Sequence, residues 1–226
     1  MSEIAYQPSD RRPLTSRDFD IFQRLATWLV VRQVSANAIS LCSIVFAAVA
    51  SLCLAGTAWT DDSRARWLFA LGALFVQARL LANLLDGMVA VASQQASPEG
   101  ELYNEVPDRV ADALILIGAG FSVAGTPALG YLSALVAVFV AYVRAFGGSV
   151  GVRGLFMGPM AKPQRMAMLT AACIYCACAP ARWPYGPAAG PFGAIDVALA
   201  LITAGGAVTA IRRLRRIALH LRRGAA

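Results

Sequence analysis

Residues 67–92 read WLFALGALFVQARLLANLLDGMVAVA, and this stretch decides the fold class. A helix needs about 20 mostly apolar residues to cross a bilayer, and the stretch is longer than that. Only Arg79 and Asp86 are charged in it. It lacks the alternation of polar and apolar residues that is typical of membrane β-strands. The stretch therefore predicts a transmembrane α-helix with polar groups in its second half.

Five more apolar runs surround this stretch, and turn-forming residues separate them. We predict an all-α polytopic integral membrane protein, with six transmembrane helices within residues 36–211. The predicted N-terminal cytoplasmic segment, 1–35, contains an interfacial helix, because 21–34 mixes apolar residues with arginines. Residues 212–226 are predicted to form a basic cytoplasmic tail. The predicted spans are 36–58, 67–92, 108–125, 129–150, 164–180 and 192–211.

The composition agrees with a membrane protein and excludes a large soluble domain. Apolar residues make up 58% of the 226 residues and charged residues 15%, and the mean hydropathy is +0.59. Soluble chains are typically about 45–50% apolar and about 25% charged. The N-terminus has no apolar core of a signal peptide, so none is expected. Five cysteines lie in apolar runs and are expected to pack there, because zinc normally needs four Cys or His ligands.

The distribution of basic residues predicts the orientation. With six spans and a cytoplasmic N-terminus, fifteen Lys and Arg residues fall on the cytoplasmic side and three on the other. Such a bias is typical of membrane proteins, whose cytoplasmic loops are rich in Lys and Arg. We therefore expect both termini on the cytoplasmic side of a bacterial-type cell membrane. The tail is expected to lie on anionic lipid rather than to bind nucleic acid.

Polar residues gather where the second and third predicted spans approach the cytoplasm. Asn83, Asp86, Gly87 and Ala90 are spaced by three or four residues and share one helical face. Asn104, Asp108 and Asp112 form a ridge on the next span, flanked by Glu101 and Glu105. Polar groups inside spans are costly and usually functional. Oxygen ligands of this kind suit a hard divalent cation such as Mg²⁺.

These residues resemble the signature of the CDP-alcohol phosphotransferase family. That signature runs Asp, two residues, Asp-Gly, two residues, Ala-Arg, eight residues, Gly, three residues, Asp, three residues, Asp. The chain fits every spacing over residues 83–108. Five of the eight signature positions are identical in this chain: Asp86, Gly87, Ala90, Gly100 and Asp108.

The resemblance implies a transferase of phospholipid biosynthesis with a cytosol-facing metal site. Such an enzyme moves a phosphatidyl or related group from a CDP-linked donor, here CDP-diacylglycerol, to an alcohol and releases CMP. It implies Mg²⁺ or Mn²⁺, one or two ions, and a homodimer. Asp108 would be the catalytic base. The implied metal ligands are Asn83, Asp86, Asn104 and Asp108, and the implied substrate-binding residues are Gly87, Ala90, Gly100, Asp112, Arg144, Lys162 and Arg165.

Three departures from the signature leave alternatives open. Asn83 and Asn104 replace acids, and Val91 replaces the arginine. The signature charge falls from −4 to −2, so metal affinity should fall unless Glu101, Glu105 or Asp112 compensates. An inactive relative that binds nucleotide or lipid is the alternative. A cation transporter is less favoured, because the acids are expected at one end of the spans and no internal repeat is visible.

Several polar residues have a structural alternative to a functional role. Arg144 could extend its charged end to the interface, and Lys162 and Arg165 could reflect the cytoplasmic bias alone. Asp112 could be a ligand or the partner of an arginine. Arg79 could pair with an acid of the site or reach the interface, and Asn37 could start a helix.

Overall fold

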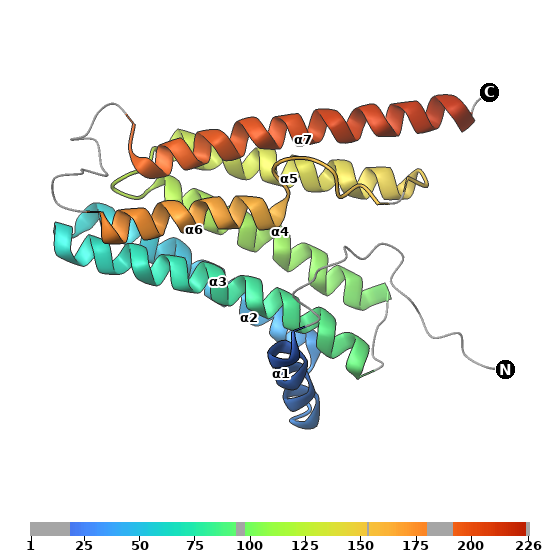
Figure 1. The fold of residues 1–226 in the computed structure, drawn as a ribbon, viewed down its shortest axis with the longest axis horizontal. Coiled ribbons are helices and arrows are strands. Elements are labelled where there is room, and N and C mark those ends of the chain that lie inside the picture. The colour runs from blue at the N-terminus through green and yellow to red at the C-terminus, as the bar shows by residue number, and fades with distance from the viewer. Residues whose placement is uncertain (1–18, 94–97, 153, 180–191, 225–226) are drawn as a thin grey trace.

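The computed structural model describes residues 19–93, 98–152, 154–179 and 192–224. Over these ranges the chain is all-α and contains no strand, as predicted (Figure 1). The helices are α1 (Asp20–Val31), α2 (Ala36–Gly56), the short 3-10 helix η2 (Thr57–Trp59), α3 (Asp62–Ala92), α4 (Pro98–Gly120), α5 (Pro127–Ser149), α6 (Lys162–Cys178) and α7 (Ala194–Gly224).

Four helices among the described residues are long and apolar enough to cross a membrane, and the chain is an integral membrane protein. These segments are Ala36–Trp59, Asp62–Ala92, Pro127–Ser149 and Ala194–Arg223. The other two expected spans, 108–125 and 164–180, lie in helices that do not meet these requirements of length and apolar composition. The first half of α4 carries several acids, and α6 has only 17 residues. The count of six spans therefore stays a prediction.

Three helices extend beyond their predicted bounds. α3 begins at Asp62 because the side chain of Asp61 caps it, accepting a hydrogen bond from the backbone N–H of Arg64 at 3.1 Å. α4 begins at Pro98, so the acidic segment before residue 108 is helical too. α7 continues through the basic segment to Gly224, because Arg, Leu and Ala all favour helix.

The helices lie side by side in a bundle in which α2 packs against both α3 and α4 (Figure 1). α6 packs against α3 and α7, and α5 packs against α4 and α7. α3 and α4 contact each other little along their length. The largest core cluster includes Leu54, Phe69, Ile115 and Leu199, all fully buried. Charged side chains of α3, α4 and α6 contact one another where these three helices meet.

α1 crosses the end of the bundle steeply, as Figure 1 shows. Its Ala26 is buried in a small cluster with Ile39 of α2 and with Leu85 and Val89 of α3. On its other side Trp28 is half exposed, with the guanidinium of Arg32 5.3 Å from the ring centroid. An amphipathic helix of this kind suits a membrane interface, as the sequence predicts.

The close approach of α4 and α5 depends on two facing glycines. A Cβ added to Gly120 would lie 2.7 Å from the Cα of Gly130. We expect Gly120→Ala to lower the free energy of unfolding by about 1–3 kcal/mol, the usual cost of overpacking. This loss should outweigh the better helix propensity of alanine, which is about 1 kcal/mol. Unfolding in detergent, followed by circular dichroism, measures the change.

The matched control is Gly148→Ala in α5, because a Cβ there would meet no atom within 4 Å. It should leave the unfolding midpoint unchanged or raise it. Equal midpoints for the two variants would show that the glycine contact does not set the packing distance of α4 and α5.

Candidate active site

Asp108 lies where three helices meet. Its Oδ2 accepts a hydrogen bond from Nζ of Lys162, the first residue of α6, at 2.5 Å. Its Oδ1 lies 3.2 Å from Nη2 of Arg79 and also accepts a hydrogen bond from the amide of Asn83, both on α3. Only 9% of Asp108 is exposed. The carboxylate therefore has two cations and an amide around it, and these contacts favour its charged form.

Asp112, one turn further along α4, forms a second ion-paired group. Its Oδ1 lies 2.7 Å from Nη2 of Arg79, and its Oδ2 accepts a hydrogen bond from Nη2 of Arg165 at 2.7 Å. All three residues are at most 2% exposed. Buried charges need such partners, because their desolvation is expensive. Pairing was one of the two alternatives left open for both Asp112 and Arg79, and the structure shows it for both, with Arg79 linking the two carboxylates.

Asp86 has a different environment. It is 3% exposed, and its Oδ2 accepts a hydrogen bond from Oγ of Ser40 on α2 at 2.7 Å. Its Oδ1 is buried without a hydrogen-bond partner among the described residues. Asp86 also interacts electrostatically with Asp108 and Lys162. Ser40 could not be identified from the sequence, because it is one of several serines in an apolar run and no spacing distinguishes it.

A third charged group lies at the edge of the site. Glu105 of α4 accepts hydrogen bonds from Arg109 on its own helix and from Arg144 on α5. The side chains of Arg144 and Glu105 are 31% and 45% exposed. Arg144 therefore pairs with an acid and does not only extend to the interface, although the pair remains accessible to a ligand.

The other predicted site residues take no part in the contacts given above. Asn104 is exposed on α4, and Gly87 and Ala90 are half-buried on α3. Gly100 lies in the first turn of α4, and the side chain of Glu101 is outside the described part. Asn37 is exposed. Ser35 caps α2 instead, accepting a hydrogen bond from the backbone N–H of Ala38 at 3.2 Å.

The predicted metal ligands do not form a ready two-ion site. Within the described ranges, no three Asp, Glu, His or Cys side chains lie close enough to hold a metal ion. Asp108 and Asp112 already pair with cations, and the amide of Asn83 is turned toward Asp108. Asp86 is the described carboxylate of this site that has a buried oxygen, Oδ1, with neither a hydrogen bond nor an ion pair. Of these residues, Asp86 is the one whose carboxylate fits a divalent ion.

The fold of this chain is shared by solved structures of another protein. The chain has the fold of the CDP-alcohol phosphotransferases, the family that the signature resembles. Among the structures that it resembles are three of the phosphatidylinositol phosphate synthase of Mycobacterium tuberculosis.

Three solved structures of that synthase superpose on most of the chain. The form with CDP-DAG bound has a TM-score of 0.71 and 18% identity, over 88% of this chain and 94% of that chain. The complex with manganese and citrate has a TM-score of 0.70 and 17% identity, over 87% and 88%. The apo form has a TM-score of 0.66 and 17% identity, over 85% and 93%. At this identity the likeness establishes the fold.

No protein-family model matches the sequence. No curated protein matches it either.

Proposed function

We propose that the chain is a membrane transferase of phospholipid biosynthesis. It moves a phosphatidyl or related phospho-alcohol group from a CDP-linked donor, CDP-diacylglycerol, to an alcohol acceptor. The observation that carries the proposal is Asp108, a buried carboxylate among Arg79, Asn83 and Lys162 at the meeting of three helices in this fold. The solved relative with CDP-DAG bound supports the choice of donor.

The chain's own residues account for binding and proton transfer. Lys162 and the accessible Arg144 supply positive charge for the donor diphosphate or for a phosphate on the acceptor. The acceptor oxygen forms a bond to the phosphorus that carries the lipid, and the bond from that phosphorus to CMP breaks. Asp108 takes the proton of the acceptor hydroxyl at its carboxylate.

A divalent ion, Mg²⁺ or Mn²⁺, would supply neutralisation of the diphosphate charge when bound. Asp86 would hold it, with the amide oxygens of Asn83 and Asn104 as weaker neutral ligands. The solved relative in complex with manganese supports the choice of ion.

The test is CMP release from CDP-diacylglycerol by the purified protein, with Mg²⁺ or Mn²⁺, across a panel of alcohols. Release with one alcohol and not with the others would identify the acceptor. The substrate-binding roles of Gly87, Ala90, Gly100, Asp112 and Arg165 would then be tested by substitution. If no alcohol supports release, the enzymatic proposal is wrong.

One observation favours a second candidate, an inactive relative that binds nucleotide or lipid. Asp108 is already paired with two cations, whereas a base must be free to accept a proton. Donor binding without CMP release under any condition would select this candidate. The homodimer that the resemblance implies is tested separately, by the mass of the protein in detergent.

The site and both termini are proposed to be cytoplasmic, because the basic end of α7 points to the same side as the end of α3 and the start of α4 (Figure 1). We expect a cysteine placed at Arg216, in a variant without the natural cysteines, to be labelled only from the cytoplasmic side. A cysteine at Thr60, exposed at the opposite end of the bundle, is the matched control and should be labelled only from outside. The reverse pattern would overturn the orientation.

A further inference from the structure

The buried charges around Asp108 balance without any metal ion. Three buried carboxylates, Asp86, Asp108 and Asp112, lie among three cations, Arg79, Lys162 and Arg165. The set as a whole therefore carries no net charge when every group is ionised. A cluster of unpaired acids would instead need added cations, which is the usual state of a two-ion centre.

The charge of the donor sets the number of ions that such a site should accept. A diphosphate that links cytidine to an alcohol has two ionised oxygens, so it brings about two negative charges. One divalent ion cancels them, whereas two ions would leave two positive charges in a largely buried region. Uncompensated buried charge is strongly unfavourable. A neutral protein site therefore favours a single ion with each bound donor.

Lys162 is placed to contact the donor diphosphate together with this single divalent ion. Its Nζ has three N–H donors, and Asp108 takes one of them at 2.5 Å. Its side chain is 22% exposed, whereas those of Arg79 and Arg165 are 0% and 3% exposed. Of the three cations, Lys162 is therefore the one that a ligand can reach, and lysine is a common phosphate-binding residue.

We propose that the ammonium group of Lys162 takes the place of the second divalent ion that the resemblance to the family allows. Held at Asp108, it binds the donor diphosphate beside a single divalent ion. The inference rests on the proposed function, because it assumes a CDP-linked donor.

The first test counts ions on the unaltered protein. Bound Mn²⁺ is measured by the loss of the free-ion signal in electron paramagnetic resonance, with saturating CDP-diacylglycerol, no alcohol, and donor micelles without protein as the blank. We expect one ion per chain. Two ions per chain would overturn the inference and leave the proposed function standing. If the donor does not bind with any ion, both fail.

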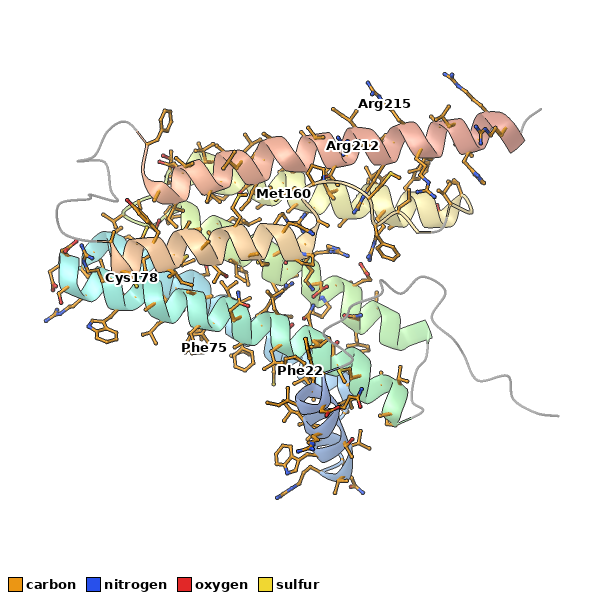
Figure 2. The ribbon with its side chains drawn as sticks, in the orientation of Figure 1. Phe22, Phe75, Met160, Cys178, Arg212 and Arg215 are labelled. Carbon is orange, nitrogen blue, oxygen red and sulfur yellow. The ribbon has the colours of Figure 1, made fainter. Side chains whose placement is uncertain are left out.

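The second test measures donor affinity for substituted proteins at a fixed Mn²⁺ concentration. Lys162→Met should weaken binding about tenfold or more, the usual effect of losing a charge-assisted hydrogen bond. Lys162→Arg keeps the charge and should stay within about threefold of the natural protein. Arg215→Met removes an equal charge from α7, where the side chain points away from the bundle (Figure 2), and should change nothing.

Unchanged donor affinity in Lys162→Met would overturn the role of the lysine. Thermal unfolding of each unliganded variant shows whether it is folded. If Lys162→Met does not fold, the ion count on the natural protein and the affinity of Lys162→Arg still decide. One ion per chain in the natural protein, together with retained donor affinity in Lys162→Arg, supports the inference. Two ions per chain in the natural protein, or a tenfold loss of donor affinity in Lys162→Arg, refutes it.

Discussion

Asp108→Asn is expected to reduce CMP release by about 10²–10⁴-fold, the usual loss when a general base is removed. The amide cannot take the proton of the acceptor hydroxyl. The substitution also removes the negative charge that pairs with Lys162 and Arg79. Initial rates of CMP release at saturating donor and alcohol measure the effect.

The matched control for this change is Asp62→Asn, at an exposed acid in the first turn of α3. It should keep full activity. Circular dichroism and donor binding show whether Asp108→Asn is folded and still recognises its substrate. A folded Asp108→Asn variant that retains near-normal turnover would contradict the assignment of Asp108 as the base.

Arg79→Met is expected to lower the free energy of unfolding by about 3–5 kcal/mol, the usual cost of breaking a buried ion pair. Arg79 is fully buried, and its Nη2 lies 3.2 Å from Asp108 and 2.7 Å from Asp112. Without it, the cations that remain paired with these carboxylates among the described residues are Lys162 and Arg165. Denaturant unfolding in detergent measures the loss, and a variant too unstable to purify would agree with it.

A double substitution separates lost pairing from lost packing. Asp112→Asn removes one of the charges that Arg79→Met leaves behind, so the double variant should recover part of the stability. The two changes should therefore be clearly non-additive, as is usual for residues in contact. Additive losses, or a loss below about 1 kcal/mol for Arg79→Met alone, would contradict a structural role for this ion pair.

The helical fold could be predicted from the sequence because the length of an apolar run indicates a membrane-spanning helix. Long apolar runs specify membrane helices, and each expected run coincides with a helix over most of its length. The helix ends were less predictable, because they depend on local features such as the cap by Asp61 and on the helix-favouring arginines of α7. The packing of α2 against both α3 and α4 depends on tertiary contacts, which no periodicity encodes.

The site was predictable where spacing along one helix decides it. Asn83 and Asp86 share a face of α3, and Asp108 and Asp112 share a face of α4. What the sequence could not predict is which charges meet across helices. Ser40 beside Asp86, and Arg79 between two acids, follow from how three separate helices pack. The same cross-helix contacts change the expected metal site, because they place cations where free carboxylates were expected.

The ion pairs of the site also have an order in time, because the ribosome makes their partners one after another. Arg79 emerges first and Asp108 follows it by 29 residues, whereas Lys162 comes another 54 residues later. At about 5–20 residues per second, that last interval lasts roughly 3–10 seconds. During it, Asp108 and Asp112 have Arg79 of the neighbouring helix as their partner, while Lys162 and Arg165 have not yet been made. We therefore expect α3 and α4 to enter the bilayer with their buried charge partly compensated by Arg79, and α6 to complete the compensation when it arrives.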